Sequence, residues 1–345
     1  MTAYERVMAA LNFTEPDRVP LVPSTRFASV KYAGYTLAQV YQDNGKYVEA
    51  QERVVNDFRL DAAWDLAGVY YVSRCLGQKM LLPEDDPPSA LEPFINSPRD
   101  LERLAELERG LNEATIVQYQ LDLDRKLRDR LGRDIPLIAY VESPFYLACV
   151  LRGTKEFYLD MYKQPTFARD LLAAATAICK RYSSLLANEA IDILYTACPQ
   201  ASRTMISKKL YLEYVHANFN EVFGFFRNVL KKKILFHVCG DWTDRFDLLV
   251  EEGPDILHVD KVDLRWLKEV CGQKVTLNGN VDTTKLLVGT PQEIEQEAWE
   301  CIEAAAPGGG FLLGGACALG RDTPAANMQA LATAVAEHGV YPINS

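Results

Sequence analysis

The feature that most constrains the fold of this chain is the alternation of short apolar runs with longer helical patterns. From about residue 133 onward this alternation is regular, which is typical of βα units that build a parallel sheet. The predicted strands are 18–22, 62–66, 135–141, 191–196, 234–239, 256–259, 274–277 and 311–315. Eight parallel strands in one chain of this length predict an α/β fold, the (β/α)8 or TIM barrel.

Helical patterns fill most of the intervals between these runs. The predicted helices are 154–161, 165–188, 207–230, 242–252, 264–270 and 290–305, the last with Pro291 in its first turn. Residues 1–17 predict a helix and a loop, and residues 78–134 hold a Pro-rich acidic loop and a long charged helix over 99–132. These N-terminal segments lack cores of their own, so we expect them to elaborate the barrel, and we predict a single domain over 1–345.

Composition excludes several classes of function. The formal net charge of −10 argues against a nucleic-acid partner, which would need a basic face. No apolar run approaches the roughly 18 residues that a membrane span needs, and Met1 to Arg18 lacks the apolar core of a secretion signal. The eight cysteines are scattered rather than closely spaced, so we expect free thiols and a cytoplasmic protein without membrane contact.

The run from Lys232 to Asp241 ends an apolar strand with an imidazole and a thiol two residues apart. Side chains at i and i+2 of an extended chain point the same way, so His237 and Cys239 can reach one metal ion. Zinc accepts both ligand types. The alternative is a packed histidine beside an inert buried thiol.

Cys317 is the best candidate for a third ligand, because it closely follows the last predicted strand. The carboxyl ends of all barrel strands lie on one face, where the active sites of such barrels are found. His237, Cys239 and Cys317 would then share that face. Three donors with a fourth position open describe a catalytic zinc site rather than a structural one.

From Pro136 to Gly339 the chain resembles the uroporphyrinogen decarboxylase superfamily, and within it the zinc-dependent methyltransferases that work with corrinoid proteins. The resemblance is carried by Pro136-Leu137-Ile138 with Ser143-Pro144-Phe145, by His237-Val238-Cys239-Gly240-Asp241, by Leu277-Asn278-Gly279-Asn280-Val281-Asp282, and by Asp322-Thr323-Pro324 with Asn327. The resemblance implies zinc ligands at His237, Cys239 and Cys317 and a corrinoid (cobalamin) carried by a separate partner protein. Cys198, which follows the predicted strand 191–196, is an alternative ligand that the resemblance does not favour.

The chain departs from the decarboxylases of this superfamily at the residues that grip their substrate. Their Arg-rich N-terminal loop is replaced by Pro23-Ser24-Thr25-Arg26-Phe27-Ala28-Ser29, and the place of their catalytic aspartate falls on Gly68, with Asp65 three residues away. A porphyrinogen with many carboxylates would need cationic partners. Tetrapyrrole decarboxylation is therefore a secondary alternative.

The resemblance implies methyl transfer between a small molecule and cobalt, in one of two directions. Zinc can hold a thiol as a thiolate that accepts the methyl group, or act as a Lewis acid on the heteroatom of a methyl donor. Aromatic residues near strand ends, including Phe27, Tyr140 and Tyr195, favour a pocket for a phenyl methyl ether, and thus O-demethylation. A thiol of the coenzyme M type is the alternative, with Arg26, Arg152 and Arg203 available for its sulfonate. A corrinoid-binding or chaperone protein is the non-enzyme alternative.

Four further polar residues are candidates for supporting roles. Glu142, after strand 135–141, is a candidate proton donor or displaceable fourth zinc ligand, or else a capping carboxylate. Asp241 lies just beyond the His-x-Cys pair, and Asn278 and Asn280 flank Gly279. Such groups can orient metal ligands or the cofactor, although Asn-Gly-Asn is also a good turn sequence.

Overall fold

A sheet of seven parallel strands forms the centre of the computed structural model, which describes residues 1–68, 70–188 and 190–343. In spatial order the strands are β1 (Ala63–Trp64), β4 (Leu137–Tyr140), β5 (Ile193–Ala197), β6 (Lys233–Val238), β7 (Ile256–Val259), β8 (Thr276–Val281) and β9 (Phe311–Gly315). Each strand pairs in parallel with the next strand of the sheet along the chain. All residues of β4, β5, β7 and β9 are buried, which explains why these strands are continuous apolar runs in the sequence.

The predicted strand 18–22 closes the sheet into a barrel, although its ladder is short. Leu21 forms a parallel bridge with Leu313 of β9, and its carbonyl accepts a 2.8 Å hydrogen bond from the N–H of Asp61, just before β1. Pro20 and Pro23 flank this bridge. Proline has no N–H to donate, which limits the ladder to an isolated bridge. The predicted (β/α)8 fold is confirmed, with this segment as the eighth element.

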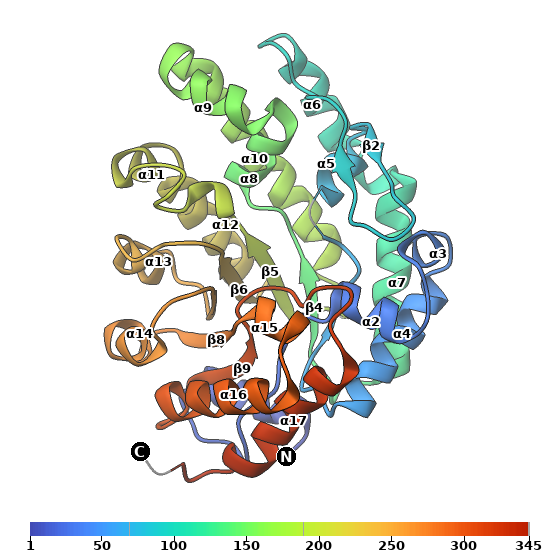
Figure 1. Cartoon of the computed structure of the whole chain (residues 1–345). Coiled ribbons are helices and arrows are strands. Elements are labelled where there is room, and N and C mark those ends of the chain that lie inside the picture. Colours follow the sequence, from blue (N-terminus) through green and yellow to red (C-terminus); the bar gives the residue numbers. More distant parts are fainter. Residues whose placement is uncertain (69, 189, 344–345) are drawn as a thin grey trace.

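Helices surround the strands (Figure 1). Along the C-terminal two thirds of the chain they are α8 (Pro144–Arg152), α9 (Thr154–Lys163), α10 (Pro165–Leu186), α11 (Lys208–Tyr214), α12 (His216–Asn228), α13 (Phe246–Glu252), α14 (Leu264–Cys271), α15 (Thr283–Val288), α16 (Pro291–Ala305) and α17 (Ala325–His338). The start of α16 follows its sequence: Thr290 caps the helix in a capping box with Glu293, and Pro291 occupies the first turn.

The N-terminal third adds further helices, most of which lie along one side of the barrel (Figure 1). They are α1 (Ala3–Leu11), α2 (Arg26–Tyr32), α3 (Leu37–Gln42), α4 (Asn44–Asp57), α5 (Tyr71–Cys75), α6 (Asp100–Arg109) and α7 (Thr115–Leu131), with a small hairpin of β2 (Met80–Leu81) and β3 (Ser89–Ala90). The predicted helical elaborations are present.

Three predicted helices are interrupted or begin later than predicted, whereas the others differ by one or two residues at their ends. The segment 207–230 forms two helices, α11 and α12, which are interrupted at Val215. The charged segment 99–132 is interrupted after Gly110, the C-cap residue of α6, and a 3-10 turn (η1, Leu111–Glu113) precedes α7. The helix predicted from residue 242 begins only at Phe246, because residues 241–245 form a turn.

The amino end of the barrel is covered by α1 and the loop that follows it. Thr276, at the start of β8, donates a 3.3 Å hydrogen bond to the carbonyl of Ala10. The three glycines 308–310 before β9 all have positive φ, and a Cβ at Gly310 would lie 2.7 Å from the Phe13 ring. This run is therefore a tight connection under α1, and it does not open a helix as a phosphate loop would. No helix in the described part of the chain is both long and apolar enough to cross a bilayer.

Candidate metal centre

The strand β6 delivers His237 and Cys239 to the carboxyl end of the barrel. His237 is the next-to-last residue of the strand, pairs in register with Ala197 of β5 and His258 of β7, and is buried. Cys239 follows two residues later, so its side chain can return to the same face. His237 and Cys239 therefore lie at the carboxyl end of β6, as the sequence predicts.

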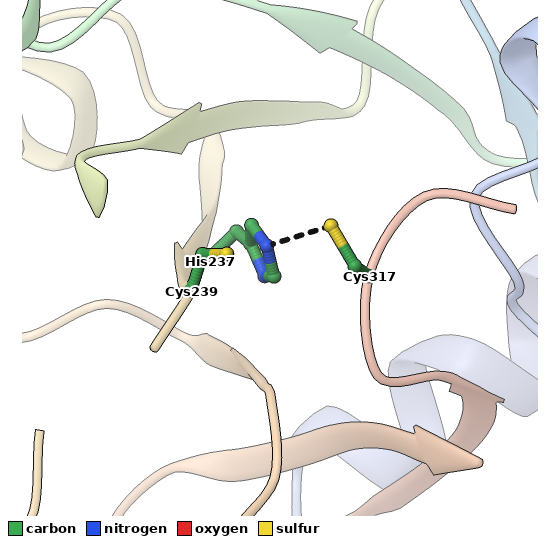
Figure 2. A group of neighbouring side chains, drawn as sticks. All are labelled: His237, Cys239 and Cys317. Carbon is green, nitrogen blue, oxygen red and sulfur yellow. Dashed lines mark hydrogen bonds between the residues drawn. The ribbon is translucent and has the colours of Figure 1, made fainter. Parts of the chain in front are cut away.

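Cys317 approaches from the segment after β9. Its Sγ lies 3.3 Å from Nε2 of His237. The possible ligand atoms of His237, Cys239 and Cys317 all lie within 4.8 Å of one another. Figure 2 shows Cys317 facing the imidazole from the opposite side of the site, with the contact drawn as a dashed line. The three residues predicted to share one face therefore converge.

The imidazole of His237 is oriented by the backbone of the neighbouring strand. Its Nδ1 donates a 3.0 Å hydrogen bond to the carbonyl of His258, which leaves Nε2 facing Cys317. A second imidazole stabilises the arrangement, because Nε2 of His258 donates to the carbonyl of Gly315 at 2.8 Å and so links β7 to the segment that carries Cys317. Burial lowers the pKa of His258 to about 3, so this ring is neutral.

Asp260, which follows β7, contacts the loop that carries Cys239. Its Oδ2 accepts a 2.9 Å hydrogen bond from the N–H of Gly240 and lies 3.7 Å from Cys239 Sγ. The indole N–H of Trp242 donates to the carbonyl of Cys239 at 3.0 Å. These bonds fix the position of the Cys239 backbone beside the imidazole.

The two thiols interact strongly. The pKa of Cys317 is lowered, first because the Cys239 thiol donates a hydrogen bond to its sulfur and also because His237 lies beside it. The pKa of Cys239 is raised, first by the same hydrogen bond and then by burial. Both sulfurs would bind a metal as thiolates, so metal binding would displace their remaining protons. One imidazole and two thiols form a donor set that fits zinc with a fourth position open.

The two predicted catalytic carboxylates are not brought to these ligand atoms. Glu142 is buried beside α5, where its Oε1 accepts a 3.1 Å hydrogen bond from the N–H of Val72, and burial raises its pKa to about 8. The Asp241 carboxylate accepts from the N–H and hydroxyl of Thr243 at 3.0 and 2.7 Å, and it pairs with Arg203. Asp241 thus forms the turn before α13, and its pKa is lowered by those bonds.

Asn278 and Asn280 lie within β8 rather than in a turn, so the turn alternative for Asn-Gly-Asn is wrong. Nδ2 of Asn278 donates to the carbonyl of Leu312 at 3.1 Å. Nδ2 of Asn280 donates to the carbonyls of Asp260 and Val262 at 2.9 and 2.8 Å. Asn280 therefore supports the segment that carries Asp260, and Asp260 in turn contacts Cys239.

The aromatic residues predicted to line a substrate pocket gather around a cation. The guanidinium carbon of Arg26 lies 6.0, 5.4 and 5.1 Å from the ring centroids of Phe27, Tyr140 and Tyr195. The Tyr195 ring is in turn 6.4 Å from the His237 ring. The sequence indicated the aromatic residues and Arg26 separately, but no spacing pattern predicted that the arginine would occupy their centre.

Comparison with known proteins places these observations in a family. The family model described as uroporphyrinogen decarboxylase (URO-D) matches residues 2–338. A methylated-thiol–coenzyme M methyltransferase from Methanosarcina mazei is 26% identical over 81% of this chain and 73% of its own length. The methylcobamide:CoM methyltransferase MtbA from Methanosarcina acetivorans is 23% identical over 95% of this chain and 97% of its own.

Two further matches define the range of the similarity. A uroporphyrinogen decarboxylase from Coxiella burnetii is 24% identical over 86% of this chain and 83% of its own length. Among solved structures, a methyltransferase from Methanosarcina mazei superposes with a TM-score of 0.86 at 21% identity, covering 98% of this chain and 99% of its own. At that identity the superposition demonstrates a shared fold.

Proposed function

The chain belongs to the uroporphyrinogen decarboxylase (URO-D) family, as its sequence resemblance predicts, and we propose that it transfers a methyl group from a corrinoid to a small thiol. The observation that carries the proposal is the convergence of His237, Cys239 and Cys317 at the carboxyl end of the barrel. Methyltransferases of the methylcobamide:CoM type, aligned over nearly their whole length, support the reaction class. They also disfavour the alternative of a corrinoid chaperone without activity.

The proposed metal is zinc, held by His237, Cys239 and Cys317. When bound, zinc lowers the pKa of a coordinating thiol and presents it as a nucleophilic thiolate. The three side chains would hold the ion and leave room for a substrate thiol. The hydrogen bonds from His237 to the His258 carbonyl and from Gly240 to Asp260 keep two of these ligands in place before the substrate arrives.

In the proposed reaction the methylated corrinoid is a substrate, carried by a partner protein that docks over the carboxyl ends of the strands. The thiol loses its proton to solvent, and its sulfur attacks the methyl carbon. A sulfur–carbon bond forms, the cobalt–carbon bond breaks, and the electron pair of that bond stays on cobalt as cobalt(I). The barrel positions the acceptor, and the corrinoid provides the reactive methyl group.

We propose a thiol acceptor as the substrate, in place of the phenyl methyl ether that the aromatic residues of the sequence favoured. Two of the relatives described above are named for coenzyme M, which supports a thiol. The rings of Phe27, Tyr140 and Tyr195 surround the Arg26 side chain, so they do not form the open apolar slot that an aryl ring needs. We propose the cytoplasm as the location because all eight cysteines are free thiols.

Tetrapyrrole decarboxylation remains the less supported alternative. Gly68, at the place of the decarboxylases' aspartate, has no room for a side chain without displacement, because a Cβ there would lie 3.3 Å from the Phe27 ring. Asp65 is buried, and its Oδ2 accepts hydrogen bonds from the N–H of Tyr140 and from Gln120. Gly68 has no carboxylate, and that of Asp65 is buried, with Oδ2 held by these hydrogen bonds and Oδ1 without a partner.

The test is a methyl-transfer assay with zinc-loaded protein, methylcobalamin and a panel of small thiols. We expect cobalt(I) to appear in the absorption spectrum together with one thioether per methyl group lost. The variant Cys317→Ser should lose the activity, whereas Cys271→Ser, which removes a buried thiol at the end of α14, should keep it. Methylation of cobalt(I) by aryl methyl ethers, with no thiol accepted, would overturn the proposed substrate.

A further inference from the structure

Two buried carboxylates meet at one amide where α7 lies beside the end of β1. Asp65 directly follows β1, and Gln120 and Asp124 lie one turn apart on α7. Nε2 of Gln120 donates to Oδ1 of Asp124 at 2.7 Å and to Oδ2 of Asp65 at 3.3 Å. All three side chains are 0% exposed. The two carboxylates are therefore held close together and out of contact with bulk water.

No cation of the chain pairs with either carboxylate. Among the residues that the structure describes, Asp65 and Asp124 make no ion pair within 4.0 Å. Burial and the neighbouring Asp124 raise the pKa of Asp65 well above its usual range, and Arg26 opposes this rise only in part. Burial raises the pKa of Asp124 to about 8. Buried carboxylates without a paired cation are costly, so the pair lacks positive charge.

Four buried oxygen atoms at this pair have no hydrogen-bond partner. They are Oδ1 of Asp65, Oδ2 of Asp124, Oε1 of Gln120 and the hydroxyl of Tyr182. Tyr182 comes from α10 and is 0% exposed. Burial raises its pKa most, and both carboxylates add to that rise, because the hydroxyl lies near them. Buried polar atoms are rarely left without partners, so these oxygens indicate a missing occupant.

The chemistry of the four oxygens indicates the kind of occupant. Gln120 cannot turn its amide over, because Nε2 is the atom that donates to both carboxylates, and Tyr182 alone has a proton to donate. A water molecule would supply donors but no charge. Oxygen ligands without sulfur or nitrogen suit a hard cation. Since Arg26 supplies one positive charge against two carboxylates, one further positive charge is needed.

We propose that a sodium or potassium ion binds between Asp65 and Asp124, held by oxygens of these carboxylates, of Gln120 and of Tyr182. This site is separate from the metal centre, whose ligands are sulfur and nitrogen. The ion neutralises the carboxylate pair and joins α7 and α10 to the end of β1. Oδ2 of Asp65 also accepts the N–H of Tyr140 at 3.0 Å, so the ion stabilises the junction of β1 and β4 as well.

The experiment measures the thermal unfolding midpoint, Tm, in sodium, potassium and tetramethylammonium chloride at equal ionic strength. Tetramethylammonium is too large and too apolar to enter a buried oxygen site. The pH is 8.5, because a proton competes for Asp124, whose pKa is about 8. We expect sodium or potassium, at about ten times its Kd, to raise Tm by about 2 °C relative to tetramethylammonium.

Three variants show whether this rise comes from the proposed site. Asp124→Asn removes one negative charge but keeps the shape of the side chain, so it should abolish the rise. Tyr182→Phe removes only a hydroxyl and should reduce the rise. The matched control is Asp160→Asn, which changes a buried carboxylate that already pairs with Arg152 at 2.7 Å and should keep the rise. Each variant is compared with itself in the three salts, so a loss of stability common to all salts does not affect the result.

Equal Tm values of the wild type in the three salts would mean that a proton or water fills the site, and would overturn the inference. A rise that both Asp124→Asn and Tyr182→Phe retain in full would overturn it too, because the ion would then bind elsewhere. Stabilisation by calcium or magnesium chloride, with none by sodium or potassium, would contradict the monovalent charge. None of these measurements depends on methyl transfer, so the site stands or fails independently of the proposed function.

Discussion

Removing the Asp260 carboxylate should weaken zinc binding although Asp260 is not among the proposed ligands. Its Oδ2 accepts the N–H of Gly240 at 2.9 Å and lies 3.7 Å from Cys239 Sγ, so it fixes the backbone that aims this thiol. Residues that support metal ligands in this way typically contribute 10- to 100-fold to metal affinity. We therefore expect Asp260→Ala to raise the zinc Kd by about 10- to 100-fold, or ~1.4–2.7 kcal/mol.

The variant Asp260→Asn tests whether the hydrogen bond from the Gly240 N–H accounts for this loss of zinc affinity. The amide oxygen can still accept the Gly240 N–H, so the Kd should rise less than in Asp260→Ala. The control is Asp263→Ala, three residues along the same loop, which removes the N-cap of α14 but touches no proposed ligand. Zinc Kd values are measured by competition with a chromogenic chelator. Wild-type affinity in Asp260→Ala, or an equal loss in Asp263→Ala, would refute the reasoning.

Two further predictions concern stability. The pKa of Glu142 is raised to about 8 from 4.5, so the folded state binds the proton more tightly than the unfolded state. Its contribution is fully present below pH 4.5 and is lost as pH rises toward 8, by up to ~1.4 kcal/mol per pH unit. Urea unfolding should therefore show the wild type losing stability relative to Glu142→Gln over that window, and parallel pH profiles would contradict this. The variant Gly310→Ala should destabilise the fold by about 1–2 kcal/mol, because φ is +69° at this position and the new Cβ would clash with the Phe13 ring. The measurement is again urea unfolding. An unchanged unfolding midpoint would contradict this prediction.

The strand pattern allowed the barrel to be predicted because buried parallel strands are apolar on both faces, and β7 and β9 match their predicted ranges. Prediction was poorer where the outcome depends on tertiary contacts. Pro20 and Pro23 reduce the eighth strand to one bridge, and β8, with Asn278 and Asn280, extends to Val281 because residues 277–281 pair in register with residues 311–315 of β9. Local propensity would place a turn at those asparagines.

The proposed ligands could be predicted because barrel topology brings strand ends together, whatever their separation along the chain. The hydrogen-bond partners of Glu142 and Asp241 could not be predicted, since a residue's position after a strand does not say which way its carboxylate turns. Glu142 turns toward α5 and Asp241 toward Thr243. The cluster of aromatic rings around Arg26 could not be predicted either, because it joins α2 to β1, β4 and β5 through side chains whose directions no sequence spacing specifies.

The measurement that tests the central claim most directly is the metal content of the purified protein, determined by elemental analysis after gel filtration. The account predicts one zinc per chain in the wild type and in Cys271→Ser, and strongly reduced zinc in Cys239→Ser and Cys317→Ser. A full complement of zinc in both Cys239→Ser and Cys317→Ser would contradict a metal centre built by His237, Cys239 and Cys317.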